Sequence, residues 1–168
     1  MKKKGDAASI IGVLNAHDVR YLVIGGIAGT LFGSPYPTDD LDICPDRRAV
    51  NLKRLAIALE ELEAKEWDPR KDTFSDRRWD EETLTIDETW LLDTKFGKLD
   101  LVFNPTGTEG FPDLRRRHVA IEVAGLSVPV SALEDLIRMK EAAGRERDLL
   151  QVPTLRKLLQ EWTAPEGL

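Results

Sequence analysis

Apolar residues recur along the chain with two spacings, and these spacings predict its secondary structure. Intervals of three and four residues are typical of a helix with one buried face, whereas strict alternation is typical of a half-buried strand. A charged segment at residues 65–80 follows neither spacing and is expected to be irregular. The pattern predicts strands at residues 20–24, 41–44, 84–86, 90–94, 99–103, 121–123 and 126–130. It predicts helices at residues 7–16, 27–32, 46–62, 111–117, 131–143 and in a last region up to about 162, whose final piece starts at Pro153.

Polar residues and glycine are expected to mark the ends of several helices. Asp46 and Ser131 are residue types favoured just before a helix, and Glu134 follows Ser131 at the spacing of a capping box. Val50 falls on the apolar stripe of the helix after Asp46 and is expected to be buried. Gly144 is expected to end the helix that begins after Ser131.

The loop between the strands at 90–94 and 99–103 decides which residue faces Asp100. An even loop centred on Phe96 and Gly97 places Asp93 opposite Asp100, where like charges repel unless a cation lies between them. An odd loop turns Asp93 outward. We favour the outward arrangement and keep Asp93 as a reserve metal ligand.

Two carboxylates at the start of the strand predicted at 41–44 alternate with aliphatic residues. Asp40 and Asp42 therefore share one face of the strand, and their charges repel each other. A bound divalent cation, paired cationic side chains or a shared proton resolves such repulsion, and a divalent cation is our leading hypothesis. Asp100 alternates with leucines in a later strand and also needs a partner, since a buried carboxylate is costly without one.

A glycine pair and a lysine are candidates for binding an anion. Gly25 and Gly26 close the first strand, where glycine lets backbone N–H groups approach a ligand; an ordinary turn is the alternative. Lys140 falls on the inward stripe of the helix at 131–143 and needs an anionic neighbour. The alternatives are that Lys140 extends to the surface or pairs with a carboxylate of the core.

The composition of the 168-residue chain is that of a globular protein, with 42% hydrophobic and 32% charged residues. The sequence contains no run near the roughly 18 apolar residues of a membrane span and no apolar signal-peptide core, so we expect a cytoplasmic protein. The single cysteine, Cys44, excludes an internal disulfide and is expected to be structural. The net charge of −6 argues against a surface that coats duplex DNA, although it permits a local basic patch.

The candidate residues occur in an order that resembles a known signature. Gly25-Gly26 is followed by thirteen residues and then by Asp40-Leu41-Asp42-Ile43, with Thr38 two residues before Asp40 and Asp100 downstream. This order resembles the DNA polymerase beta-like nucleotidyltransferase superfamily. The segment from 136 to 148 is similar to the C-terminal part of small prokaryotic members, including abortive-infection and toxin–antitoxin nucleotidyltransferases. The resemblance covers roughly residues 19–148.

The resemblance implies an α/β (α+β) fold in which a small mixed β-sheet packs against helices. It implies one nucleotidyltransferase-like domain over residues 1–168, with a core at about 19–130 and C-terminal helices at 131–162. A nucleoside triphosphate would lie between the glycine pair and the carboxylate strand. Asp40 and Asp42 would hold two Mg²⁺ ions, and Asp100 would complete the ion that activates the acceptor hydroxyl.

The resemblance also assigns residues to the triphosphate, and it has two departures. Backbone N–H groups after Gly25 and Gly26 would meet the phosphates near Thr38, and Lys140 would steady the β- and γ-phosphates, with Arg145 as second choice. Many relatives have arginine two residues before the threonine, where this chain has Tyr36. Others have serine where this chain has Gly26.

The activity implied is transfer of a nucleoside monophosphate to an acceptor hydroxyl. The acceptor is expected to be a tRNA end or a protein, with a role in a toxin–antitoxin system and an antitoxin as a possible partner protein. A small antibiotic is the less favoured acceptor, because a short chain leaves little room for a separate substrate domain. The alternative is a non-catalytic binding or regulatory module of the same fold.

Overall fold

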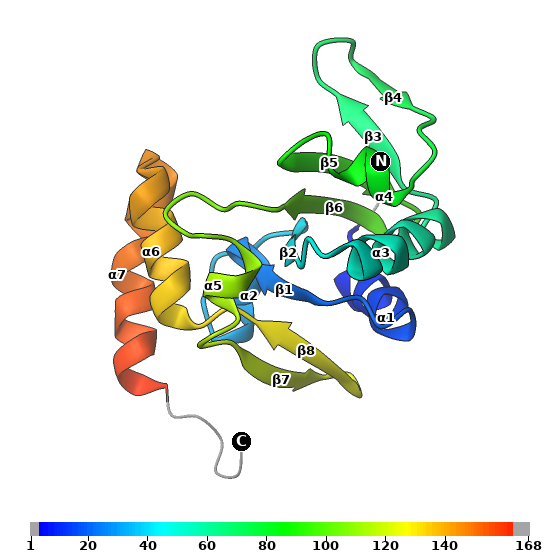
Figure 1. Ribbon diagram of the computed structural model, residues 1–168. Helices are drawn as coiled ribbons and strands as arrows, with labels where there is room; N and C mark the ends of the chain where they lie inside the picture. The colour runs from blue at the N-terminus through cyan, green and yellow to red at the C-terminus, as the bar shows by residue number, and fades with distance from the viewer. Residues whose placement is uncertain (1–3, 163–168) are drawn as a thin grey trace.

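A computed structural model describes residues 4–162, which contain one mixed eight-stranded sheet (Figure 1). The strand order is β4-β3-β5-β6-β2-β1-β8-β7. Strand β2 is antiparallel to β1 and parallel to β6, and β1 is parallel to β8, which confirms the expected mixed sheet. The strands are β1 (Tyr21–Ile24), β2 (Leu41–Pro45), β3 (Lys65–Asp68), β4 (Thr73–Ser75), β5 (Thr89–Thr94), β6 (Gly97–Val102), β7 (Val119–Val123) and β8 (Leu126–Val130).

Helices lie on both faces and at one end of this sheet. Figure 1 shows α6 and α7 side by side at one end, whereas the β3–β4 hairpin projects from the opposite end. Within residues 4–162, none of the helices has the length and apolar character needed to cross a membrane. The helices are α1 (Ala7–Ala16), α2 (Gly25–Leu31), α3 (Ala49–Glu61), α4 (Glu81–Leu84), α5 (Phe111–Leu114), α6 (Leu133–Ala143) and α7 (Glu146–Glu161).

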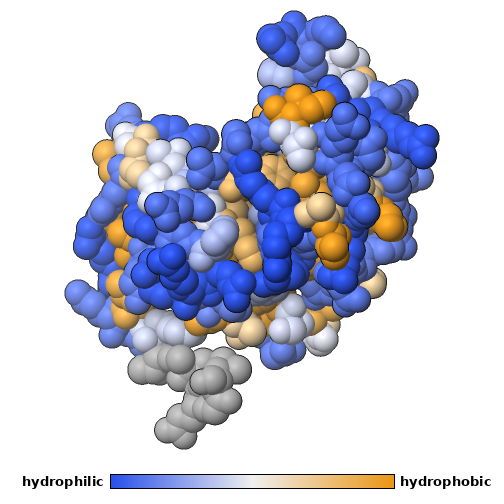
Figure 2. All heavy atoms as spheres, in the orientation of Figure 1, coloured by the Kyte–Doolittle hydropathy of each residue, from blue (hydrophilic) through white to orange (hydrophobic). Residues whose placement is uncertain are grey.

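The two faces of the sheet are covered to different extents. In β1, Tyr21 and Val23 face a large core that includes residues of α1 and α3, whereas Leu22 and Ile24 face the other side. On that other side, a smaller cluster packs β1 and β2 against α5 and part of α6. We call this second side, which also carries Asp42, the site face. Hydrophilic side chains cover most of the surface visible in Figure 2, with apolar ones in separate patches.

The structure replaces two of the predicted irregular or extended segments with regular elements. The segment at 65–80 contains the β3–β4 hairpin, in which Trp67 pairs with Phe74. Residues 84–86 do not form a strand, because Asp80 begins helix α4 by accepting a hydrogen bond from the Thr83 N–H at 2.7 Å. The glutamates at the start of α4 further favour the helix.

Two predicted caps are wrong because tertiary contacts shift the starts of both helices. Ser131 is buried and its backbone N–H donates to Val23, so β8 continues up to it and α6 follows Ala132. The capping box therefore does not form. Asp46 is buried beside Arg20 and Arg48, and α3 begins only at Ala49.

Other helix predictions are corrected in their bounds. Val50 is 61% exposed, because the late start of α3 leaves it in the first turn. Helix α2 begins at Gly25 rather than at residue 27, and α7 runs without a break through Pro153. Gly144 ends α6 in the left-handed conformation, with φ 67°, as predicted.

The β5–β6 hairpin turns one residue earlier than the even loop considered from the sequence. Its turn residues are Lys95 and Phe96, so Asp93 pairs with Lys98. Asp100 instead lies opposite Leu91. The favoured odd loop, which would turn Asp93 away, is therefore wrong: Asp93 lies on the same face as Asp100, where it is exposed and opposite Lys98.

Candidate active site

Three carboxylates meet where β2 and β6 lie side by side. Asp42 in β2 pairs in register with Asp100 in the parallel strand β6, so both side chains project from the site face. Asp40 immediately precedes β2, and its charge acts on both Asp42 and Asp100. The alternation seen in the sequence thus gathers all three aspartates around one point of the sheet.

The environment of this pair favours the protonated carboxyl. Burial, followed by the neighbouring charge of Asp100, raises the pKa of Asp42 to about 7, although the Lys140 charge acts in the opposite direction. Burial also raises the pKa of Asp100. At neutral pH the pair therefore retains part of a proton unless a cation replaces it.

The donor set fits a divalent cation in its chemistry. Three carboxylates that repel one another are the hard oxygen ligands that Mg²⁺ prefers, and a cation would relieve their repulsion. Among residues 4–162, however, no three His, Cys, Asp or Glu side chains are placed to ligate one ion together.

Gly25 brings the start of α2 against the carboxylates. Its φ is +71°, a conformation that residues with a side chain rarely adopt. A Cβ at this position would lie 2.3 Å from Asp42 Oδ2, so only glycine allows this approach. The glycine pair is therefore packed directly onto the carboxylate strand.

Gly26 is close to Thr38 in the same way. A Cβ on Gly26 would lie 2.9 Å from Thr38 Cγ2 and 3.0 Å from its Cβ. A serine at position 26 would thus require Thr38 to move. Glycine rather than serine at this position thus matches the local packing of this chain.

Two cations converge on one acidic residue across the α6–α7 turn. Lys140 Nζ lies 3.4 Å from Asp148 Oδ1, and Arg145 Nε lies 2.6 Å from Asp148 Oδ2. Burial acts to raise the pKa of Asp148, but the Arg145 hydrogen bond and the Lys140 charge outweigh it and lower the pKa. Lys140 thus pairs with a carboxylate, as one of the alternatives predicted, and still lines the cavity described next.

All eight residues selected from the sequence line one cavity of about 510 Å³. The aspartates lie on its floor at β2 and β6, whereas the cations come from the α6–α7 end. The eight residues are Gly25, Gly26, Thr38, Asp40, Asp42, Asp100, Lys140 and Arg145. Tyr36, where relatives have arginine, lines the same cavity and is 37% exposed.

Comparison with solved structures shows what this arrangement resembles. A protein from Thermotoga maritima assigned as a nucleotidyltransferase superposes with a TM-score of 0.58 at 20% identity, over 93% of this chain and 91% of that one. Lincosamide antibiotic adenylyltransferase LnuA, with lincomycin bound, superposes with a TM-score of 0.59 at 15% identity, over 90% of this chain and 95% of that one. ANT(2″)-Ia, in complex with adenylyl-2″-tobramycin, superposes with a TM-score of 0.54 at 14% identity, over 92% of this chain and 86% of that one.

The chain has the nucleotidyltransferase fold. The fold expected from the sequence signature is thereby confirmed, on neighbours that cover most of the chain. No protein-family model matches the sequence, and no curated protein matches it either. The likeness therefore concerns the fold alone.

In this nucleotidyltransferase fold, further cavity residues escaped the sequence reasoning. Pro105 and Thr106 come from the loop after β6, where the sequence carries no signal of a site. Met139 precedes Lys140, and Arg147 lies two residues after Arg145. Inspecting the neighbours of the two predicted cations would have found these last residues.

Proposed function

We propose that the protein is a metal-dependent nucleotidyltransferase that moves a nucleoside monophosphate from a triphosphate to an acceptor hydroxyl. The observation that carries the proposal is the meeting of the signature residues in one cavity around the in-register pair Asp42 and Asp100. Nothing local in the sequence forces residues so far apart along the chain to share a cavity. The nucleotidyltransferase fold of the neighbours supports the same reaction class.

The carboxylates have the central role in this proposal. Asp40 and Asp42 would hold two Mg²⁺ ions, and Asp100 would complete the coordination of one of them. When bound, these ions neutralise the triphosphate and lower the pKa of the attacking hydroxyl. Asp100 lies beside Asp42 and accepts the proton as the hydroxyl oxygen bonds to the α-phosphorus and pyrophosphate leaves.

The α6–α7 end of the cavity binds the leaving phosphates. Lys140 and Arg145 share Asp148 in the free protein, so an incoming phosphate competes with one carboxylate for two cations. Gly25 and Gly26 line the same cavity, next to Asp42 and Thr38 respectively. The triphosphate thus extends from the aspartates toward α6.

Lys140→Gln is expected to weaken Mg²⁺-dependent nucleotide binding about tenfold, because a charge-assisted contact to phosphate is lost. Isothermal calorimetry with a nucleoside triphosphate and Mg²⁺ measures the change. Lys157→Gln, which alters an exposed lysine of α7 outside the cavity, is the matched control. Equal dissociation constants for the two variants would exclude Lys140 from the phosphate site.

The transfer reaction itself separates an enzyme from a binding module of the same fold. Protein incubated with α-labelled nucleoside triphosphates, Mg²⁺ and an acceptor is expected to release pyrophosphate and label the acceptor. A non-catalytic module, the alternative function, binds its partner without turnover. Nucleotide binding with no label transfer to any acceptor would favour the module over the enzyme.

The fold does not identify the acceptor, so the acceptor class is part of the proposal. A tRNA end, a protein hydroxyl and a role beside an antitoxin were expected from the resemblance. The chain-length argument against a small acceptor does not hold, because this chain covers 95% of LnuA, whose structure contains an antibiotic.

A further inference from the structure

The sheet ends on one side at β7, whose outer backbone edge has no strand beside it. Figure 1 shows β7 and the β3–β4 hairpin at opposite ends of the sheet. Within residues 4–162, β8 is the only strand that pairs with β7, and no backbone hydrogen bond joins residues 119–123 to a loop or a helix. The backbone groups on the outer side of β7 are therefore free to pair with another strand.

Two contacts of β8 show which of its residues bond to β7. The Ser127 C=O accepts a hydrogen bond from Asn15 Nδ2 at 3.0 Å, so its backbone points away from β7. The Ser131 N–H donates to the Val23 C=O, so residue 131 also points away. Pro129, midway between them, has no N–H to donate. Because backbone direction alternates along a strand, β8 bonds to β7 through residues 126, 128 and 130.

Ala120 and Glu122 are therefore the residues of β7 whose backbone faces outward. They lie opposite Pro129 and Ser127, the two residues of β8 that point away from β7. In such pairs the N–H and C=O groups of both residues point away from each other. Each of the two outward residues thus offers one donor and one acceptor at the free edge of the sheet.

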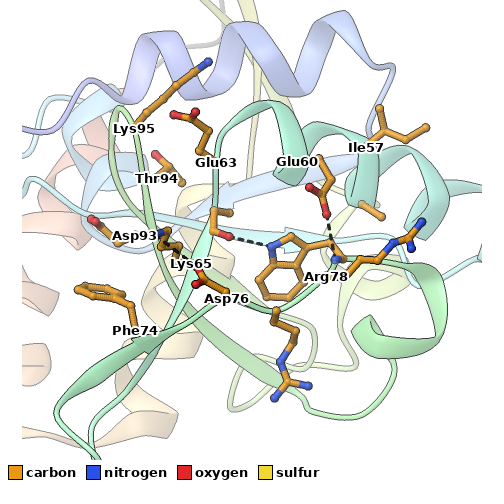
Figure 3. A pocket seen from close by; sticks show the side chains of 14 residues that line it. Ile57, Glu60, Glu63, Lys65, Phe74, Asp76, Arg78, Asp93, Thr94 and Lys95 are labelled. Carbon is orange, nitrogen blue, oxygen red and sulfur yellow. Dashed lines mark hydrogen bonds and ion pairs between the residues drawn. The ribbon is translucent and has the colours of Figure 1, made fainter.

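The opposite edge of the sheet is protected against pairing with another strand. Strand β4 has only three residues, and charged residues flank it, Asp72 before and Asp76 after. Figure 3 shows Asp76 and Lys65 near Phe74 of β4, and Lys65 forms an ion pair with Asp76 at 3.4 Å. Short strands and charged side chains are two ways in which proteins block edge-to-edge association. Strand β7 has neither protection, since its five residues include one charge and no lysine or proline.

We propose that β7 is the interface of a homodimer, in which it pairs antiparallel with β7 of a second copy around a two-fold axis at Ile121. Ala120 of each copy then exchanges both backbone hydrogen bonds with Glu122 of the other copy. All of the outward backbone groups of β7 are paired in this way. The two sheets thereby continue into each other.

The sequence of β7 matches itself in this register. Val119, Ile121 and Val123 are half-buried and pack on the edge of the main core. Across the axis, Ile121 meets Ile121 of the second copy and Val119 meets Val123, so each gains an apolar neighbour. On the exposed face, Glu122 meets Ala120. An axis at Glu122 would oppose two like charges, and an axis at Ala120 would place an arginine against Val123.

This interface is separate from the cavity that holds the carboxylates. None of residues 119–123 lines that cavity, so dimerisation leaves it open in both copies. The inference therefore goes beyond the proposed nucleotidyl transfer and does not depend on it. Nucleotide binding is expected to be the same in dimeric and monomeric variants.

Analytical ultracentrifugation of the full chain is expected to give twice the chain mass of 18.9 kDa. Ala120→Pro removes an outward N–H, and an edge strand tolerates proline at such a position, so the bonds between β7 and β8 are preserved. The dissociation constant of the dimer is expected to rise about a hundredfold, because each copy loses a hydrogen bond and leaves a C=O unpaired. Ala120→Ser keeps the N–H, is the matched control and is expected to remain dimeric.

Disulfide cross-linking tests the register. At the axis, Ile121 and its counterpart form a non-hydrogen-bonded pair with Cα atoms about 4.5 Å apart, a separation that a disulfide spans. Ile121→Cys is therefore expected to form a disulfide-linked dimer under oxidising conditions, whereas the buried Cys44 of the wild-type protein does not react. Ser127→Cys, exposed on β8 and about 14 Å from its counterpart, is the control that stays unlinked.

The outcomes distinguish this inference from the proposed function. A wild-type protein that stays monomeric up to its solubility limit would overturn the interface, and so would equal dimerisation of Ala120→Pro and Ala120→Ser. Absence of the disulfide in Ile121→Cys would overturn the register on which the interface is built. Matching far-UV circular dichroism spectra show that both variants of Ala120 are folded. Mg²⁺-dependent nucleotide binding, measured on the same samples, tests the proposed function whatever the oligomeric state.

Discussion

Asp42→Asn is expected to reduce nucleotidyl transfer about a thousandfold or more, because it removes a proposed metal ligand at the centre of the carboxylate cluster. Asn retains the shape of the side chain, so the fold and the pairing of β2 with β6 are preserved. Pyrophosphate release under saturating Mg²⁺ measures the loss. Asp87→Asn, in the exposed loop before β5, is the matched control and is expected to keep wild-type activity. Activity within tenfold of wild type in Asp42→Asn would remove Asp42 from the metal site.

In the absence of metal, Asp42→Asn is expected to raise the stability of the folded protein, although it lowers the activity. Burial raises the pKa of Asp42 to about 7, whereas the unfolded chain releases this proton at about pH 4. Between these values the folded protein holds the extra proton, so its free energy of unfolding falls as the pH rises. Asp42→Asn lacks this loss and is expected to be more stable than wild type near pH 8, on the order of a few kcal/mol.

Urea unfolding in a metal chelator at about pH 5 and about pH 8 measures this difference. The advantage of Asp42→Asn is expected to be larger at the higher pH and to shrink when Mg²⁺ binds the wild-type protein. A constant difference between the two pH values would show that Asp42 titrates at its ordinary pKa.

Gly25→Ala is expected to lower transfer activity about a hundredfold, since its Cβ would displace Asp42 Oδ2, 2.3 Å away. The positive φ of Gly25 adds backbone strain of about 1–3 kcal/mol, so the variant is also less stable. Steady-state kinetics and urea unfolding measure the two effects separately. Wild-type activity in Gly25→Ala would mean that the contact between α2 and the carboxylate strand does not position Asp42.

Gly12→Ala provides the matched control for Gly25→Ala. Gly12 lies inside α1, and a Cβ there would meet no atom within 4 Å. The substitution is expected to stabilise the protein by up to about 1 kcal/mol, because alanine is the better helix former, and to leave transfer unchanged. The pair therefore separates a general glycine effect from the close approach at Gly25.

The parts of the site that the sequence predicted depend on local chemistry. Asp40 and Asp42 alternate within one strand, and Gly25 and Gly26 end another, so each pair carries its own signal. Their meeting in one cavity depends on β1 and β2 being neighbours, which periodicity does not specify. The resemblance supplied that long-range information.

The parts that were missed depend on contacts between distant segments or on competing partners for polar residues. Thr106 reaches the cavity only because the loop after β6 passes α6, and no local pattern marks it. Ser131 has the chemistry of a cap, but its backbone is taken by the sheet at Val23. Asp80, overlooked as a cap, accepts the hydrogen bond that begins helix α4. Propensity identifies suitable residues, whereas tertiary pairing selects among them.

The β3–β4 hairpin is attached to the rest of the sheet through only two residue pairs with β5, Lys65 with Asp93 and Glu66 with Leu92. It contributes no residue to the cavity that holds the carboxylates. For protein engineering, the hairpin is therefore an exchangeable cassette: a grafted hairpin that keeps these two pairings would alter the outer half of the sheet while leaving Asp42 and Asp100 in place.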